Sequence, residues 1–248
     1  MIILKSRQEI AYMRQAGRIV ALTLQELGKR VRPGVTTGEL NQFADDFIRR
    51  AGGVPAFLNY QGFPASICTS VNNEVVHGIP GLRRLENGDI ISIDVGAFYQ
   101  GYCGDSSYTF PVGEISEEAR RLLEVTREAL ERGIAQAVPG NRIGDISFAI
   151  QSFVEGHGYQ VVRDFVGHGI GKKMHEEPQV PNFGKPGHGP RLEPGMALAI
   201  EPMVNAGTYE VAVMPNHWTV VTKDGSLSAH FEHTVVVTEG QPEVLTRL

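Results

Sequence analysis

The chain has 248 residues, of which 42% are hydrophobic and 21% charged, and its net charge is −5. This composition is ordinary for a globular protein and excludes a broad phosphate-binding surface, so no specific nucleic-acid binding is expected. Two cysteines exclude a disulfide framework and a cysteine-rich zinc site. The apolar run at the N-terminus is too short for a signal peptide, and no stretch is long enough for a membrane helix. We therefore expect a cytoplasmic protein with no membrane partner.

Capping signals and apolar periodicity predict four helices. Ser6-Arg7-Gln8-Glu9 and Thr36-Thr37-Gly38-Glu39 both have the pattern of a capping box, in which the first and last side chains bond each other's backbone. The predicted helices end before runs rich in glycine or proline. Their approximate ranges are 6–29, 36–51, 117–138 and 144–156. Strand-like runs occupy 66–76, 90–98, 102–110, 160–166, 196–204, 210–221 and 228–238.

The sequence contains an internal repeat. Residues 33–53 align without gaps on residues 139–159 at an offset of 106, and a second block, 85–94, aligns on 192–201 at an offset of 107. Two blocks at nearly the same offset indicate a duplication.

The duplication predicts an α+β fold in a single domain spanning 1–248. The two αβ halves, approximately 1–113 and 114–248, are expected to be related by a pseudo-twofold axis. They would share one mostly antiparallel, curved sheet with helices on its outer face. The repeat also places Asp94 and Glu201 at equivalent ends of apolar strands, so their side chains should converge on a central cleft.

Two acids lie within a predicted β-hairpin in the first half. A ladder centred between Tyr99 and Gln100 pairs Asp94 directly with Asp105 across the strands. Glycines in the hairpin could add a bulge and shift this register. Like charges so placed are destabilising unless a cation offsets them. Either both acids lie on a solvent-exposed face of the hairpin, or a cation lies between them.

Other acids and histidines are candidates for the rest of a metal site, which would then contain four carboxylates and one or two imidazoles: His168, His175, Glu201 and Glu232. Four buried carboxylates without cations would be prohibitively costly. Two divalent ions and a bridging hydroxide bring the charge to about −1, so the count favours two ions over one. The oxygen-rich ligand set suits Mn(II), Fe(II) or Co(II), and Zn(II) also fits.

Five motifs occur in order along nearly the whole chain: VxHG (75–78), IDVG (93–96) with a second Asp eleven residues after the first, GHGIGxxxHExP (167–178), EPM (201–203) and SLSAHFEHT (226–234). Together they resemble a type I methionine aminopeptidase, in its short bacterial form. This resemblance implies the pita-bread fold, with two pseudo-symmetric αβ halves, and a single catalytic domain. It also implies removal of the initiator methionine from nascent polypeptides when the next residue is small. A monomer is expected, and ribosome contact is left open.

The resemblance also implies a role for each metal-site residue. Asp94 would bind one metal ion in bidentate fashion, and Asp105 and Glu232 would bridge both ions. His168 and Glu201 would complete the coordination of the other ion.

Three residues would act on the substrate. By resemblance, Glu201 would be the general base and then the acid, His175 would donate to the peptide carbonyl oxygen, and His77 would contact the scissile nitrogen or its neighbour. The neutral α-amine of the substrate would bind a metal ion, which restricts cleavage to N-termini. Because Met1 is followed by Ile2, we expect this chain to keep its own initiator.

An apolar pocket for methionine is expected beside these residues. Met174 stands where the family commonly has Phe, so the rim is predicted to be looser there. Cys68 matches the pocket cysteine of bacterial members, and soft side chains suit a thioether guest. By resemblance the substrate-binding residues are His77 and His175 with Tyr60, Phe63, Cys68, Met174, Met203 and Trp218.

The remaining histidines are predicted to be surface or core residues: His157, His188, His217, His230 and His233. Two other classes of function compete with the main prediction. One is another enzyme of the same architecture, such as an Xaa-Pro aminopeptidase, a prolidase or a creatinase, although these usually carry an added N-terminal domain. The other is a binding or structural protein on this scaffold that needs no metal, although such relatives lose ligands that this chain retains.

Overall fold

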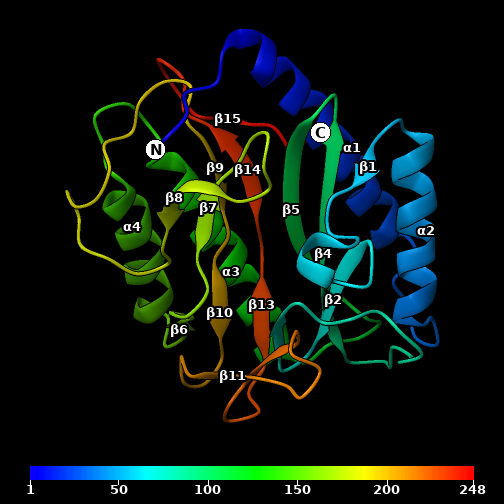
Figure 1. Cartoon of the computed structure of the whole chain (residues 1–248). Coiled ribbons are helices and arrows are strands. Elements are labelled where there is room, and N and C mark those ends of the chain that lie inside the picture. Colours follow the sequence, from blue (N-terminus) through cyan, green and yellow to red (C-terminus); the bar gives the residue numbers. More distant parts are fainter.

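The computed structural model describes residues 1–248 and places four α-helices on the outer side of a curved layer of strands (Figure 1). No helix combines the length with the apolar composition that crossing a bilayer requires. The helices are α1 (Arg7–Gly28), α2 (Thr37–Arg50), α3 (Glu117–Ala135) and α4 (Ile143–Gly156), with a short 3-10 helix at Tyr60–Gly62. The strands are β1 (Val54–Pro55), β2 (Ile67–Val71), β3 (Glu74–Val76), β4 (Ile90–Tyr99), β5 (Tyr102–Pro111), β6 (Gln160–Val161), β7 (Gly167–Gly169), β8 (Glu176–Val180), β9 (Ala197–Ile200), β10 (Met203–Asn205), β11 (Val211–Val213), β12 (Val220–Thr222), β13 (Ser228–His230), β14 (His233–Val236) and β15 (Glu243–Val244).

Capping side chains fix where α1 and α2 begin. The Ser6 hydroxyl accepts a hydrogen bond from the Glu9 N–H, and the Glu9 carboxylate accepts one from the Ser6 N–H at 2.8 Å. Thr36 and Glu39 make the same reciprocal pair at the start of α2. Each pair satisfies backbone donors that the first turn of a helix leaves free. Both predicted capping boxes are confirmed.

The same local geometry recurs at both ends of the sequence repeat. Thr36 forms an isolated antiparallel bridge with Arg84, and Arg142 forms one with Arg191, at the repeat offsets. The glycine two residues before each bridge has a positive φ, 89° in the first half and 96° in the second. Glycine adopts this left-handed region without steric penalty. The α1–α2 and α3–α4 layers therefore meet their strands in corresponding ways.

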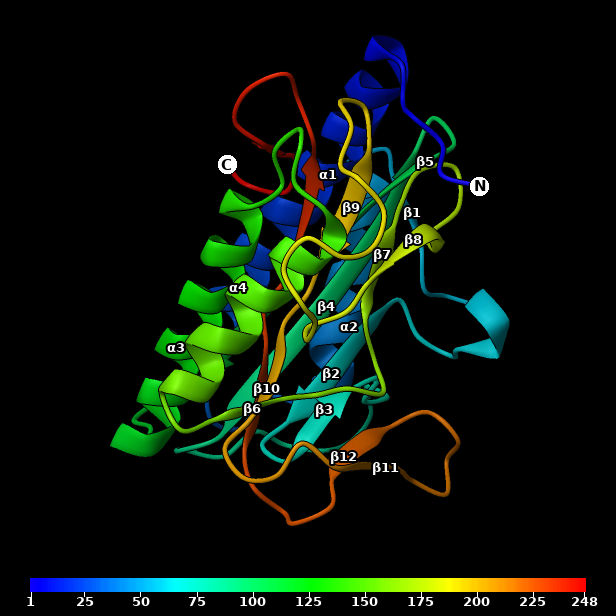
Figure 2. The ribbon, with the colours of Figure 1, turned by 90° about the vertical axis from the view of Figure 1, so that its left-hand side faces the viewer.

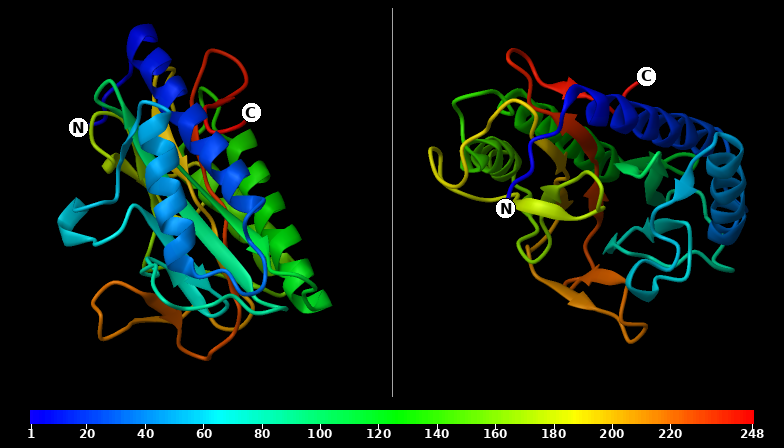
Figure 3. Two further views of the ribbon diagram at one scale, coloured as in Figure 1. Left: turned by 90° about the vertical axis from the view of Figure 1, so that its right-hand side faces the viewer. Right: turned by 45° about the horizontal axis from the view of Figure 1, so that its top comes forward.

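Each pair of helices covers its own part of the strand layer, and a hydrophobic core lies beneath each pair (Figure 3). Leu27 of α1 and Ile48 of α2 are fully buried against β4, and Leu122 of α3 and Ile146 of α4 are fully buried against the second half. Loops project from the face that the helices leave open, including residues 56–66 and the β11–β12 segment (Figure 2).

Every strand pairing is antiparallel, and the ladders divide into four hydrogen-bonded sheets. β1, β4, β2 and β5 form one sheet from the first half, and β15, β14, β9, β7 and β8 form one from the second. The halves meet where the Glu232 N–H donates to Ser107 O at 2.9 Å and Thr234 Oγ1 donates to Asp105 O at 2.7 Å. The antiparallel layer is present as predicted, but its ladder is interrupted between the halves and not continuous.

The β4–β5 hairpin has a register different from the predicted one. Gly96 pairs with Asp105, and Asp94 pairs with Ser107. The turn lies one residue later than predicted, at 100–101, where both residues have positive φ, 50° and 78°. Such a turn matches the right-handed twist of a hairpin. The direct pairing of the two acids is therefore wrong, but they lie on one face as diagonal neighbours, which long side chains still bridge.

α1 packs against β5 and the C-terminal segment through glycines. A Cβ atom at Gly17 would lie 2.4 Å from Leu245 O, and one at Gly104 would lie 2.7 Å from the Gly17 nitrogen. We expect Gly17→Ala to lower the free energy of unfolding by about 1–3 kcal/mol, because the added methyl group pushes the helix away from fixed backbone. Urea denaturation measures the change. Gly81→Ala, where a Cβ meets nothing within 4 Å, is the control, and an equal loss in both variants would contradict the explanation.

Candidate metal centre

A cavity of about 190 Å³ collects the side chains to which the sequence assigned a function. The structure adds Phe57, Gln61, Val76, Phe165 and Val166 to its wall. Phe165 and Val166 directly precede the GHG motif, and this position was the one available sequence signal for them. The predicted residues in the wall are Tyr60, Phe63, Cys68, His77, Asp94, Asp105, His168, Met174, His175, Glu201, Met203, Trp218 and Glu232.

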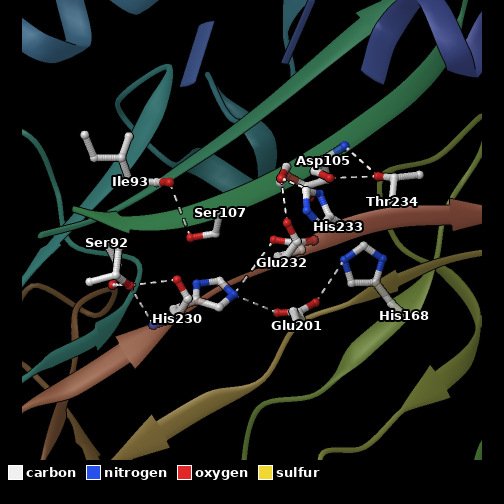
Figure 4. Close-up of polar contacts among 12 residues, drawn as sticks. Ser92, Ile93, Asp105, Ser107, His168, Glu201, His230, Glu232, His233 and Thr234 are labelled. Carbon is white, nitrogen blue, oxygen red and sulfur yellow. Dashed lines mark hydrogen bonds and ion pairs between the residues drawn. The ribbon is translucent and has the colours of Figure 1, made fainter. Parts of the chain in front are cut away.

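Glu201 and Glu232 face each other where two ladders break. β9 pairs with β14 as far as Ile200, and β10 pairs with β13 from Met203 onward, so the intervening Glu201 lies directly opposite Glu232. Pro202 has no N–H to donate, which ends the ladder at this point. Two opposed anions are destabilising unless a cation lies between them. The break therefore turns two acids from separate strands toward one point in the cavity (Figure 4).

The hairpin supplies the other two carboxylates. Cys68 pairs with Asp94 across β2 and β4, so both side chains lie on the face that lines the cavity. The backbone of Asp105 is bonded to the second half, because its N–H donates to Thr234 Oγ1 at 2.9 Å (Figure 4). Asp105 and Glu232 are 4% and 1% exposed. β5 therefore presents its acid to the acids of the second half across the junction of the two halves.

His168 is oriented as a metal ligand. Its Nδ1–H donates to Gly169 O at 2.8 Å, which leaves the Nε2 lone pair toward the cavity, 3.5 Å from Glu201 Oε1. A hydrogen bond of this kind fixes the tautomer and the ring of a metal-ligating histidine. The ligand atoms of Asp105, His168 and Glu232 all lie within 4.8 Å of one another. These distances suit a bound ion.

Burial dominates the electrostatics of the acids and histidines. It raises the pKa of Asp105 to about 7, and it raises the pKa of Glu201 and Glu232 well above the usual range, with a further contribution from the charge of Asp105. Desolvation lowers the pKa of His168 to about 3. Without a cation, the protein environment therefore disfavours every charge in the cluster. A dication at the carboxylate oxygens reverses this preference, because its field favours ionised carboxylates and neutral imidazole.

Unpaired oxygen atoms show that the cluster fits divalent cations. Asp94 Oδ1, Asp105 Oδ1 and Glu232 Oε1 are buried and have no hydrogen-bond partner. An unsatisfied buried polar group is costly, and a buried anion more so. Four carboxylates and one imidazole match the mixed oxygen and nitrogen ligand sets of first-row divalent metals. The residues present therefore fit a metal centre.

Two further histidines approach the cluster from loops. Tyr60 OH lies 2.7 Å from His175 Nδ1, and the ring of His175 is 4.1 Å from that of His168. His77 has a φ of 59°, a strained backbone that non-glycine residues adopt mainly where the surroundings impose it. Its ring meets Phe165 edge-on at 5.7 Å. Both histidines line the cavity.

One wall of the cavity is apolar and contains sulfur. Cys68, Met174 and Met203 are buried, and Trp218 meets the ring of Phe63 edge-on at 5.1 Å. Polarisable side chains adapt to an unbranched thioether. The predicted pocket residues therefore form one wall beside the acids, and Cys103, between the two hairpin acids, is buried outside it.

His230 was predicted to be an ordinary core or surface residue, and the structure places it in the core, 2% exposed, beside two acids of the candidate metal centre. Its Nε2 atom lies 3.7 Å from Glu201 Oε2 and 3.8 Å from Glu232 Oε2 (Figure 4). The signal available in the sequence was its position two residues before Glu232, on the same side of the strand. His233 instead bonds Thr246 Oγ1 through Nδ1 at 2.8 Å. The remaining three histidines, His157, His188 and His217, are exposed and lie outside the cavity, as predicted.

Comparisons with known proteins show the family of the chain. The model of metallopeptidase family M24 matches residues 11–239. The chain belongs to metallopeptidase family M24. This M24 chain is 59% identical to a methionine aminopeptidase of Clostridium acetobutylicum over 99% of both chains, and 56% identical to methionine aminopeptidase 1 of Bacillus subtilis over 100% of both.

A solved structure extends the comparison to the whole fold. The crystal structure of methionine aminopeptidase from Thermotoga maritima covers 100% of both chains with a TM-score of 0.99 at 47% identity. The M24 chain therefore has the pita-bread fold that the sequence motifs predicted.

Proposed function

We propose that this chain is a methionine aminopeptidase, a metal-dependent hydrolase that removes an N-terminal methionine when the next residue is small. The observation that carries the proposal is one cavity that joins an apolar, sulfur-containing wall to a cluster of four carboxylates and a histidine. The wall suits the methionine side chain, and the cluster suits the reacting end of the peptide. The substrates would be peptides and nascent chains that begin with methionine.

Five residues would hold the metal ions: Asp94, Asp105, His168, Glu201 and Glu232. When bound, two divalent ions activate water for attack and bind the substrate's neutral amine. Their number follows from the four carboxylate charges, and Mn(II), Fe(II), Co(II) or Zn(II) would suit the ligands. Occupancy by two ions, a monomeric state, a cytoplasmic location and any ribosome contact stay predictions.

The chain's own residues would move the protons. Glu201 would take a proton from the attacking water and give it to the leaving amine, since its buried carboxylate borders the cluster. His175 would donate a proton toward the carbonyl oxygen as charge develops there. His77, on the same cavity wall, would contact the scissile nitrogen. A partly enclosed cavity also limits the water around these groups, which strengthens each electrostatic contact.

Tyr60 is predicted to keep His175 in its active tautomer. Its hydroxyl lies 2.7 Å from Nδ1, and donation from the hydroxyl to Nδ1 would leave the proton of the neutral ring on Nε2, free to donate to substrate. We expect Tyr60→Phe to lower kcat about fivefold, the value of one hydrogen bond of about 1 kcal/mol. Steady-state kinetics on Met-Ala-Ser measure the loss. Phe retains the ring that lines the cavity, so a large rise in KM with an unchanged kcat would contradict the assignment.

One assay separates the proposed function from its competitors. The purified chain is incubated with Met-Ala-Ser and with Xaa-Pro peptides, with and without chelator, and with added Mn(II) or Co(II). Methionine release that is lost on chelation supports the proposal. Turnover of Xaa-Pro peptides alone would identify a proline-specific relative. No turnover with any metal would identify a binding protein.

A further inference from the structure

His230 is buried with a polar atom that has no hydrogen-bond partner. The side chain is 2% exposed, and Nε2 faces the carboxylates of Glu201 and Glu232 (Figure 4). The distances to their Oε2 atoms are nearly equal, 3.7 and 3.8 Å. Almost all buried polar groups in folded proteins are bonded. A buried nitrogen without a hydrogen bond, between two acids of the candidate metal centre, therefore requires an explanation.

The backbone of His230 is held by hydrogen bonds across the junction of the two halves. Its N–H donates to Thr109 Oγ1 at 2.9 Å, and that hydroxyl donates to His230 O at 2.8 Å. Ser92 Oγ lies 2.8 Å from the same Thr109 hydroxyl. These bonds tie the end of β13 to β5 of the other half. The backbone position from which the imidazole projects is therefore fixed at the junction of the two halves.

The two acids dictate the proton position on the ring. A lone pair on Nε2 would repel both oxygen atoms, whereas an Nε2–H would attract both. The distances exceed a hydrogen bond by less than about 1 Å, which a small rotation of either carboxylate removes. Glu201 then lies between two imidazoles, with Oε1 toward His168 and Oε2 toward His230.

We infer that His230 is a positioning residue whose Nε2–H donates to the carboxylates of Glu201 and Glu232 and orients both acids for metal binding. This inference rests on the proposed metal-dependent function. The competing role is that of a direct ligand, since Glu201, His230 and Glu232 also bring ligand atoms within 4.8 Å of one another. Hydrogen bonds from outside the ligand shell hold metal-binding carboxylates in place in other proteins.

Two substitutions separate donor from ligand. In glutamine, the Nε2 atom is three bonds from Cβ, as in histidine, and it carries N–H groups, while the only ligand atom of glutamine is a carbonyl oxygen, which the Co(II) spectrum distinguishes from an imidazole nitrogen. Leucine has a similar reach but no donor. His230→Gln should therefore preserve the positioning contact, and His230→Leu should remove it. His188→Gln, in an exposed loop, is the control for histidine replacement as such.

The experiment is a calorimetric titration of chelator-stripped full-length protein with Mn(II) alone. We expect His230→Leu to weaken Mn(II) binding about 10–100-fold. His230→Gln should stay within about threefold of the original chain, because one neutral donor replaces another. The visible absorption of the Co(II)-loaded His230→Gln variant should match that of the original chain, since the ligand set is unchanged.

Three results would overturn these expectations in distinguishable ways. If His230→Gln binds Mn(II) as weakly as His230→Leu, or if its Co(II) spectrum shifts, then His230 is a ligand. If His230→Leu binds as the original chain does, then His230 is an ordinary core residue. If the original chain itself binds no Mn(II), the proposed function fails along with the inference. Should His230→Leu not fold, as judged by thermal unfolding, His230→Asn replaces it, because its shorter amide cannot reach the acids.

Discussion

Glu201→Gln is expected to lower kcat for Met-Ala-Ser by about 10²- to 10⁴-fold, the usual contribution of a positioned acid or base. Glutamine has the shape of glutamate, and its carbonyl oxygen can still face the cluster. It cannot accept the proton that the attacking water must lose. Stopped assays at saturating Mn(II) measure the rate, and metal analysis of the same samples shows whether the ions remain bound.

The thermal stability of the Glu201→Gln variant is the control for this prediction. The carboxylate lies directly opposite Glu232 at the break between two ladders, and its side chain is 13% exposed. Removing a buried negative charge from an acid cluster should not unfold the chain, so the thermal midpoint should not fall. Turnover within about threefold of the original chain, with metal bound, would show that another group is the base.

Lys5→Met is expected to lower the free energy of unfolding by about 3–5 kcal/mol, because it leaves the Glu176 carboxylate buried without its partner. Lys5 Nζ lies 2.6 Å from Glu176 Oε2, and the two side chains are 3% and 8% exposed. Glu176 also accepts from the Lys173 N–H at 3.1 Å and directly follows His175. The pair therefore ties the N-terminal segment to the loop that carries a candidate catalytic residue. Urea denaturation measures the loss, and kcat should fall as His175 loses its support.

The double variant Lys5→Met with Glu176→Gln tests the cause. A neutral amide removes the unpaired charge, so stability should return to within about 1–2 kcal/mol of the original chain. Arg14→Met is a matched control, because Arg14 pairs with Glu243 at 2.6 Å on the surface, where ion pairs contribute about 0–1 kcal/mol. If Lys5→Met and Arg14→Met destabilise equally, the pair is not the anchor described here.

The sequence predicted well wherever the signal is local. Ser6 with Glu9 and Thr36 with Glu39 fixed two helix starts, because a capping box is complete within four residues. The motif residues line one cavity, but the predicted place of Asp94 at a strand end was wrong, since it lies in the middle of β4, whereas Glu201 directly follows β9. Predicted strand runs 196–204 and 228–238 each proved to be two strands, since Pro202 and the residues opposite it interrupt the ladder.

The hairpin register shows where local reasoning failed. Placing the turn one residue early moved the partner of Asp94 by two positions, from Ser107 to Asp105. Turn preferences at neighbouring positions differ little in energy, whereas the full ten-residue ladder and its packing on α1 decide between them. The conclusion that the two acids share a face survived, because a shift of two keeps each side chain on its side of the sheet.

The sequence by itself determined the residue types that can bind cations, the helix starts and the duplication, since each is written in residues close together or in a repeated order. Only the tertiary structure decided that Glu201 lies opposite Glu232, that His230 points between them, and that Lys5 pairs with Glu176, 171 residues away. These contacts depend on how separate strands and loops pack, and local preference carries no information about distances across the fold. The chemistry that each side chain offers can therefore be inferred from the sequence, whereas the residues that it contacts are known only from the tertiary structure.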